Sequence, residues 1–239
     1  MTSSDPTTGA ELRRELDLVG RLLLAALIAT VAALPFLALL LLVRTGYAPL
    51  ATLDADVAAD VSGWIRQRPG LVDLLEVLAI VTSPWVFRLL VLSAAVVLWR
   101  HGRRRLATWA VVTMVVGGAL GVGLKLLVGR ARPVFDEPVA FAPGLSFPSG
   151  HALNSMLGAA LLLMVVLPAL SRRSRVAVWT AAITAVLVTG LDRVGLGVHY
   201  ISDVLGGWAL ALAVLVGTVT AFGTWRQEHP AAPAGVGPG

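Results

Sequence analysis

Residues 22–43 read LLLAALIATVAALPFLALLLLV and contain no charged side chain. A helix needs ~20 predominantly apolar residues to cross the hydrocarbon core of a bilayer, so this run is long enough for one span. It is too long for the apolar core of a signal peptide, and no convincing small-residue cleavage site follows it. The run therefore predicts a transmembrane helix, with an expected kink at Pro35.

Five further apolar runs predict, together with the first, an all-α bundle of six transmembrane helices. Of the 239 residues, 57% are hydrophobic and 14% are charged, whereas soluble domains average about 25% charged residues. This composition excludes an ordinary cytosolic enzyme and a disordered chain. The expected spans are 22–43, 74–99, 106–128, 149–170, 176–191 and 200–222.

The segments around these spans divide the chain into one membrane domain with two polar ends. Residues 1–20 are expected to form a cytoplasmic N-terminal segment, and residues 21–222 the membrane domain. Within that domain, residues 44–73 form the longest polar connection and are expected to include an interfacial amphipathic helix. Residues 223–239 are rich in Pro, Gly and Ala, which predicts a disordered cytoplasmic tail.

The distribution of basic residues predicts the orientation of the bundle. Cytoplasmic loops of membrane proteins carry an excess of Lys and Arg. Placing both termini in the cytoplasm puts most of the 19 basic residues on that side. The residues concerned are Arg13, Arg14, Arg21, Arg100, Arg103, Arg104, Arg105, Arg172, Arg173, Arg175 and Arg226. On this assignment Arg130 is one of a few loop charges on the outer side.

The overall charge and the scarcity of metal ligands limit the possible partners. The formal net charge is +5 and the pI is about 10.9, which makes nucleic-acid binding the first possibility to test. Because the bases form short clusters between apolar runs, membrane topology explains them better, and no nucleic-acid partner is expected. The chain has no Cys and only four His, so a thiolate nucleophile, disulfides and a His-rich metal centre are not expected.

Three polar stretches depart from the apolar pattern, and all three fall at the outer face of the predicted bundle. They read KLLVGRARP (125–133), FPSGH (147–151) and LDRVGLGVHYISD (191–203). Ionisable residues at the membrane edge are costly to bury, so such residues are candidates for function. The first stretch places Lys125 and Arg132 two helical turns apart, on nearly one face if the helix continues.

The second and third stretches hold groups that suit phosphoryl chemistry. His199 and Asp203 lie four residues apart, so the carboxylate can hold one imidazole nitrogen and leave the other free to attack. Pro148, Ser149 and Gly150 resemble a loop that enters a helix, where backbone N–H groups can bind a phosphate. Positive side chains can neutralise the oxygens of a transferring phosphoryl group. The cations nearby are Lys125, Arg132 and Arg193.

These stretches together resemble the signature of the type 2 phosphatidic acid phosphatase and haloperoxidase superfamily. That signature has Lys, six residues and Arg-Pro; then Pro-Ser-Gly-His; then Arg, five residues, His, three residues and Asp. All three parts occur here in order, and the resemblance covers roughly residues 70–222. It implies a membrane-bound bacterial lipid phosphatase that needs no metal ion and no other cofactor.

The resemblance also implies a role for each matching residue. His199 would be the nucleophile that forms a phosphohistidine, and Asp203 would orient and polarise it. His151 would protonate the leaving group and later activate water. The phosphate-binding residues would be Lys125, Arg132, Ser149, Gly150 and Arg193.

Position 192 departs from the family pattern, and two residues of the second span have open roles. The family usually has Ser before the third-motif Arg, whereas this chain has Asp192. We expect this carboxylate to point away from the phosphate and to pair with Arg193 or with a loop base. Arg88 and Glu76 either pair with each other or with a neighbouring helix, or Arg88 lies near the inner interface; a substrate role for them is the alternative.

The sequence therefore predicts a multi-pass plasma-membrane phosphatase whose site faces outward. The expected partners are the bilayer and a lipid phosphate, either a polyprenyl (undecaprenyl) pyrophosphate or a phosphatidate-type lipid. A phosphotransferase with the same site remains open, as does a lipid transporter without chemistry, although no inverted repeat supports transport. A vanadium haloperoxidase would share the site residues, but the relatives with that activity are soluble.

Overall fold

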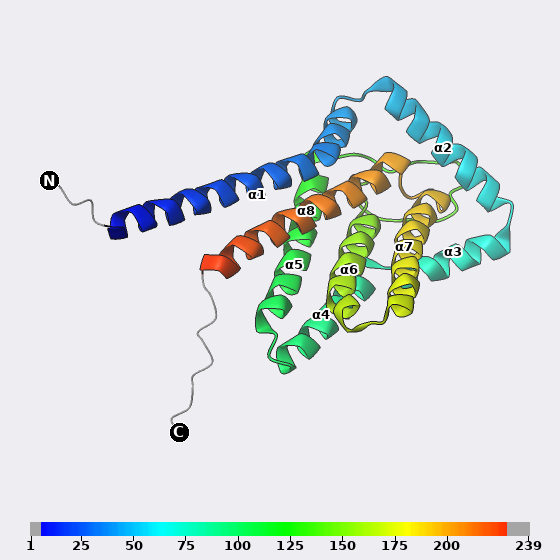
Figure 1. Ribbon diagram of the computed structural model, residues 1–239. Helices are drawn as coiled ribbons and strands as arrows, with labels where there is room; N and C mark the ends of the chain where they lie inside the picture. The colour runs from blue at the N-terminus through cyan, green and yellow to red at the C-terminus, as the bar shows by residue number, and fades with distance from the viewer. Residues whose placement is uncertain (1–5, 229–239) are drawn as a thin grey trace.

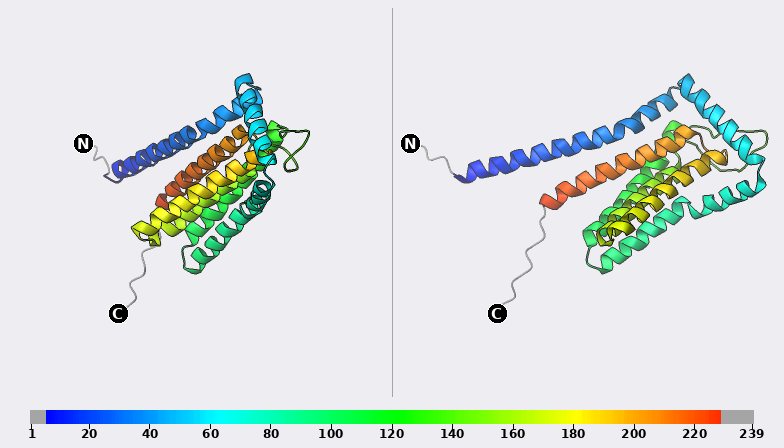
Figure 2. Two further views of the ribbon diagram at one scale, coloured as in Figure 1. Left: turned by 90° about the vertical axis from the view of Figure 1, so that its right-hand side faces the viewer. Right: turned by 45° about the vertical axis from the view of Figure 1, so that its right-hand side comes forward.

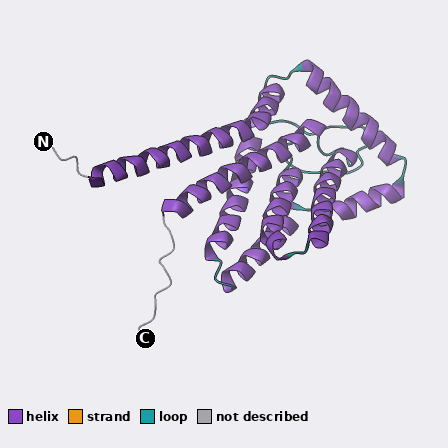
Figure 3. Cartoon of the chain, viewed as in Figure 1, coloured by secondary structure: helices purple, strands orange, loops and turns teal. Residues whose placement is uncertain are grey.

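The computed structural model describes residues 6–228, and the regular structure over that range is entirely helical (Figures 1 and 3). The elements are α1 (Pro6–Arg44), α2 (Ala48–Arg66), α3 (Pro69–Val81), α4 (Pro84–Arg100), α5 (Arg104–Val128), α6 (Gly150–Val166), η1 (Leu167–Ala169), α7 (Arg172–Gly195) and α8 (Ile201–Glu228).

Six stretches of these helices are long and apolar enough to cross a membrane, which confirms the predicted all-α, multi-pass fold. Their mean hydropathy lies between 1.5 and 2.7. The six candidate spans are Val19–Arg44, Pro69–Arg100, Arg104–Val128, Gly150–Ala169, Arg172–Gly195 and Ile201–Gly223. The segment predicted to hold an interfacial helix contains α2, which is not among the candidate spans.

The helices at the two ends of the chain are longer than the sequence predicts. Helix α1 begins at Pro6, inside the predicted N-terminal segment 1–20. Helix α8 continues to Glu228, so the prediction of a disordered tail from residue 223 is wrong for residues 223–228. A helix can run past the apolar stretch because its backbone hydrogen bonds do not depend on apolar side chains. The rest of the predicted tail lies outside the described residues.

The second predicted span consists of two helices rather than one. Helix α3 ends at Val81 and α4 begins at Pro84, with Ser83 in an extended conformation (ψ 154°) between them. Proline disfavours a helical conformation in the residue before it, and its fixed φ suits the first turn of a new helix. Pro84 therefore marks a helix boundary, and α3 begins five residues before the predicted start at residue 74.

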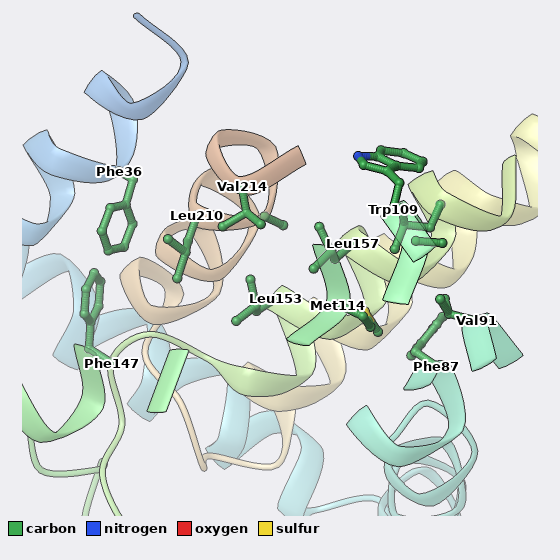
Figure 4. Packing of buried hydrophobic residues seen from close by; sticks show 13 residues of the cluster. Phe36, Phe87, Val91, Trp109, Met114, Phe147, Leu153, Leu157, Leu210 and Val214 are labelled. Carbon is green, nitrogen blue, oxygen red and sulfur yellow. The ribbon is translucent and has the colours of Figure 1, made fainter. Parts of the chain in front are cut away.

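Helix α6 is the centre of the bundle and packs against α4, α5, α7 and α8, while α1 packs along α8. Figure 4 shows Leu153 and Leu157 of α6 lying among side chains from α5 and α8. Close helix contact within a bilayer depends on small residues at the interface. A Cβ atom on Gly117 of α5 would lie 2.5 Å from the Leu157 side chain, and one on Gly121 would lie 2.7 Å from the Leu153 side chain.

The connections that bear the polar motifs meet at one end of the bundle. Figures 1 and 2 show that the loop between α5 and α6, the α7–α8 turn and α2 lie at that end. The start of α1 and the end of α8 point toward the opposite end. Two stacked rings, those of Phe36 and Phe147 with centroids 6.1 Å apart, join α1 to the last part of the α5–α6 loop.

Candidate active site

Every residue that the sequence assigns to the site lies at a helix end or in one of the two loops at this end of the bundle. The fold thus gathers side chains that are far apart in the chain, up to the 78 residues that separate Lys125 from Asp203. The residues are Lys125 in the last turn of α5, Arg132 in the following loop, Ser149 at the N-cap of α6, Gly150 and His151 in its first turn, Arg193 near the end of α7, His199 in the α7–α8 turn, and Asp203 in the first turn of α8.

His199 and Asp203 form a buried pair. The His199 Nδ1 atom lies 3.4 Å from Asp203 Oδ2, and the two residues are 2% and 0% exposed. The same carboxylate oxygen accepts from the Ser146 hydroxyl at 2.5 Å and from the Tyr200 backbone N–H at 2.9 Å. A carboxylate held by several donors keeps a fixed direction, so it can select the imidazole tautomer with the proton on Nδ1.

Arg132 contacts the other nitrogen of the same imidazole. Its Nη1 atom lies 3.0 Å from His199 Nε2 and donates to the Val198 carbonyl at 2.6 Å. Burial, together with the positive charges of Arg132 and Lys125, lowers the pKa of His199 to about 4, although the hydrogen bond and charge of Asp203 oppose this shift. At neutral pH the imidazole is therefore uncharged, and with its proton on Nδ1 a lone pair on Nε2 faces Arg132.

Lys125 anchors the loop that precedes α6. Its ammonium group donates to the carbonyls of Leu145 at 2.6 Å and Ser146 at 3.0 Å. Ser146 in turn bonds to Asp203, so Lys125 and the buried carboxylate are joined through one serine residue. The lysine thus sets the position of the loop and also contributes positive charge beside His199.

The Pro-Ser-Gly-His stretch opens α6 and is locked against α8. The Ser149 hydroxyl accepts the Ala152 N–H at 3.4 Å as a helix cap, and the Ser149 N–H donates to the Asp203 carbonyl at 2.9 Å. This approach requires a glycine at position 207, because a Cβ there would lie 2.7 Å from the Ser149 carbonyl oxygen. Ser149 is therefore the N-cap residue of α6, and the first turn of the helix begins at Gly150.

His151 lies on the α6 side of the site, beside α3. Its ring hydrogen-bonds to the backbone of Ala79 on α3, and it is within electrostatic range of Arg193, His199 and Arg132. The break between α3 and α4 therefore matters for the site, because α3 supplies a partner that orients this imidazole. A histidine near His199 and two arginines can serve as an acid or base toward a group bound among them.

Arg193 is paired with its chain neighbour, as the sequence predicts for Asp192. The guanidinium donates from Nε at 2.9 Å and also from Nη2 to Asp192 Oδ2, and both residues are buried. Among the described residues, the other carboxylate oxygen, Asp192 Oδ1, is buried without a hydrogen-bond partner. The Arg193 carbonyl accepts the His199 N–H at 3.2 Å, which ties the end of α7 to the turn that carries the histidine.

Four residues that contact the site are not among those predicted from the sequence: Asp54, Arg130, Ser146 and Ser202. Arg130, expected to be an outer loop charge, is 17% exposed at its side chain and pairs with two fully buried carboxylates. Its contacts are Asp203 at 2.7 Å, Asp54 at 2.7 Å and Ser202 at 2.7 Å. Asp203 and Asp54 raise the pKa of Arg130 although burial works against its charge.

A sequence signal existed for Arg130 but not for Asp54. Arg130 stands two positions before Arg132 in the first motif, so it could have been included with that motif. Asp54 is one of several acidic residues in the polar segment, and its partner Ser202 lies 148 positions away. Arg88 also has a defined partner, because its Nε donates to Asn154 on α6 at 2.9 Å, which is the neighbouring-helix alternative.

The fold and the site define a polytopic helical membrane protein with a buried His–Asp pair among basic side chains. The profile of the PAP2 superfamily matches residues 106–227. This match covers α5 to α8 and all three motif stretches. The chain therefore belongs to the PAP2 superfamily, as the motifs predict.

Two curated relatives and one solved structure are similar to the chain. Phosphatidylglycerophosphatase B of Bacillus subtilis (strain 168) is 42% identical over 37% of this chain and 44% of its own length. Undecaprenyl-diphosphatase of Sulfolobus acidocaldarius is 30% identical over 45% of this chain and 50% of its own length. The chain thus matches about half the length of each.

The solved structure shares the fold over most of both chains. It is the crystal structure of a transmembrane PAP2 type phosphatidylglycerolphosphate phosphatase from Bacillus subtilis, with a TM-score of 0.67. The superposition covers 87% of this chain and 99% of that chain at 23% sequence identity. The likeness extends beyond the matched profile, so the first helices also belong to the shared architecture.

Proposed function

We propose that this protein is an integral-membrane lipid phosphatase that works without a metal ion through a phosphohistidine on His199. The observation that carries the proposal is the buried His199–Asp203 pair, whose second nitrogen faces Arg132. An uncharged imidazole beside a guanidinium is suited to attack a phosphoryl group that the guanidinium holds. The names of both curated relatives, which are lipid phosphatases, support the same activity.

The proposed reaction has two steps, transfer of the phosphoryl group to His199 and then its transfer to water. In the first, the Nε2 lone pair of His199 attacks phosphorus while the bond to the lipid oxygen breaks, and His151, protonated on both ring nitrogens when the phosphate is bound, gives one proton to that oxygen. Asp203 holds the Nδ1 proton and stabilises the positive charge that develops on the ring. In the second step, His151 takes a proton from water, the oxygen attacks phosphorus, and the P–N bond breaks.

Arg132 must change partners during this cycle. In the free protein one of its N–H groups faces the His199 Nε2 atom that has to attack. A phosphate oxygen is a stronger acceptor for a guanidinium than an imidazole nitrogen, because the bond is charge-assisted at both ends. We infer that substrate takes over this N–H group and thereby releases the nucleophile.

We propose that the site faces the outside of the plasma membrane and that both termini are cytoplasmic. The arginine clusters near residues 100–105 and 172–175 lie at the turns opposite the site, which supports this orientation under the positive-inside rule. Because the chain lacks Cys, single cysteines report topology directly. An impermeant maleimide should label Glu137→Cys but not His101→Cys in intact cells, and the reverse pattern would overturn the orientation.

The substrate is proposed to be a lipid with a terminal phosphate or pyrophosphate. The relatives' names point to phosphatidylglycerophosphate and undecaprenyl diphosphate as the first two compounds to test. Phosphatidic acid and a water-soluble phosphomonoester complete the panel. The lipid tail would enter between helices while the phosphate meets Lys125, Arg132 and Arg193.

The test is phosphate release by detergent-purified protein in the presence of EDTA. We expect wild type to hydrolyse at least one lipid and His199→Ala to lose that activity, whereas His101→Ala, which changes an exposed histidine, should match wild type. A labelled substrate should also leave an acid-labile phosphoryl group on wild type. Wild-type rates in His199→Ala would refute the proposal, and a phosphorylated acceptor in place of free phosphate would identify a phosphotransferase.

A further inference from the structure

Helix α2 contributes a buried carboxylate that reaches the catalytic pair through a second arginine. Asp54 is fully buried, whereas its helix neighbours Asp56 and Asp60 are exposed. The helix lies outside residues 106–227, the part of the chain that matches the family profile. Burying an aspartate is costly unless its charge is paired, so its partners indicate what it does.

Asp54 makes two kinds of contact at the start of α8. Its Oδ1 atom accepts the Ser202 backbone N–H at 3.0 Å, and its Oδ2 atom accepts the Ser202 hydroxyl at 2.5 Å. The carboxylate therefore caps α8 from another helix, at the end where the helix dipole favours negative charge. The Oδ2 atom also accepts from Arg130 Nη2 at 2.7 Å.

Arg130 connects this carboxylate to the one that holds His199. Its Nη1 atom donates to Asp203 Oδ1 at 2.7 Å, while Asp203 Oδ2 faces the imidazole at 3.4 Å. The Tyr200 ring lies 4.2 Å from the guanidinium and covers it. One guanidinium thus stands between two fully buried carboxylates, which leaves the group of three with one net negative charge.

We propose that Asp54 and Arg130 are positioning residues that fix both the direction and the effective charge of Asp203, and thereby the reactivity of His199. The inference rests on the proposed function, since it concerns the same histidine. If Asp54 loses its charge, Arg130 neutralises Asp203 alone, and the imidazole loses support for its developing positive charge. If Arg130 loses its charge, two buried carboxylates face each other.

The test is the pH profile of kcat/KM for three variants in the full-length protein. Asp54→Asn keeps an oxygen for the Ser202 cap but removes the charge, Arg130→Gln removes the bridge, and the double variant restores one net negative charge. The charged and titratable groups around His199 are Asp203 on α8, Arg132 in the α5–α6 loop, Lys125 on α5, His151 on α6 and Arg193 on α7.

The pH dependence of kcat/KM reports the pKa values of the free enzyme, so its acid limb follows the pKa of the His199 imidazole, which must be uncharged to attack. Removing a negative charge should move that limb to lower pH in Asp54→Asn, and removing a positive charge should move it to higher pH in Arg130→Gln. The double variant should return toward wild type. We expect kcat in each single variant to fall on the order of 10–100-fold, as for outer partners of metal-binding histidines, with a smaller loss in the double variant.

Matched controls separate this role from a purely structural one. Asp56→Asn changes an exposed carboxylate on the same helix and should leave the profile unchanged. A cap alone predicts lower stability with no shift of the acid limb, so unshifted limbs in both single variants, or shifts in the same direction, would overturn the inference. If Asp54→Asn does not fold, the direction of the shift in Arg130→Gln still tests the inference, because only the charge role predicts a shift to higher pH.

Different results would refute the histidine mechanism and the role of Asp54 and Arg130. An active His199→Ala would refute the histidine mechanism whatever the three variants do. An inactive His199→Ala combined with unshifted profiles would leave the mechanism standing and remove Asp54 and Arg130 from it.

Discussion

Replacing Asp192 with Ser should strengthen substrate binding while it weakens the fold. The Asp192 carboxylate forms an ion pair with Arg193, one of the side chains proposed to bind phosphate. Two N–H groups of Arg193 already donate to Asp192, so a phosphate that approaches Arg193 has to compete with this carboxylate. Ser, which the family usually has at this position, removes that charge.

The size of the binding effect follows from Coulomb repulsion. Two unit negative charges that contact one guanidinium and lie ~6 Å apart repel by ~3 kcal/mol at an effective dielectric of 20. This corresponds to an upper limit of about 100-fold in affinity, and water at the mouth of the site reduces it. We expect KM to fall by about 10-fold in Asp192→Ser, with kcat changed much less.

The effect on stability has the opposite sign. Breaking a buried ion pair costs ~3–5 kcal/mol because the remaining charge is left unpaired. The unpartnered Asp192 Oδ1 atom already costs wild type ~1–3 kcal/mol, and the substitution removes that penalty. The difference is a net loss of roughly 2 kcal/mol.

The assay combines steady-state kinetics on a short-chain lipid phosphate with thermal unfolding in detergent. Inorganic phosphate should raise the Tm of Asp192→Ser by more than that of wild type, because it replaces the missing partner of Arg193. Asp136→Ser, which changes an exposed carboxylate in the α5–α6 loop, is the matched control. A higher KM in Asp192→Ser would refute this reasoning and show that Asp192 orients Arg193 for substrate.

Three further predictions concern packing, charge and pH. Gly207→Ala should lower stability by ~1–3 kcal/mol, seen as a lower Tm, because its Cβ would meet the Ser149 carbonyl at 2.7 Å; retention of the wild-type Tm would show that α6 and α8 can separate at this point. Lys125→Met should raise KM about 10-fold or more and also lower Tm, since it loses a phosphate-binding charge and two loop bonds; loss of only one of these properties would assign Lys125 a single role. With the pKa of His199 at about 4 in the folded protein and about 6.5 when unfolded, the unfolded chain binds more protons between these values, so stability should fall as pH drops from about 6.5 to 4. Between these pH values the titration of His199 should change kcat/KM little. An acid limb near pH 6.5 that disappears with His199 would contradict the lowered pKa.

The sequence predicted the membrane fold well because the relevant signal is local. An apolar run of sufficient length must form a helix in a bilayer, where every backbone hydrogen bond has to be made within the segment. The boundaries were less accurate where composition changes gradually, as at the end of α8, or where Pro84 divides a continuous apolar run into α3 and α4. These differences depend on backbone geometry rather than on hydropathy.

The motif residues were found for a related reason, namely that their spacing within each stretch carries information. His199 and Asp203 are one helical turn apart in sequence and form a pair in the structure. The neighbouring charge of Asp192 likewise made its pairing with Arg193 predictable. What could not be read from the sequence is how a stretch of one helix meets another, since that depends on the three-dimensional packing of the bundle.

Asp54 shows what this limit means for function. Nothing around it in sequence distinguishes it from Asp56, yet one is fully buried against Arg130 and the other is exposed. The distinction arises because α2 crosses the end of the bundle and places one of its faces against the start of α8. A carboxylate enclosed there shares the Arg130 guanidinium with Asp203, because that guanidinium pairs with both carboxylates. The burial of one aspartate on a connecting helix therefore ties a segment outside the family profile to the chemistry proposed for His199.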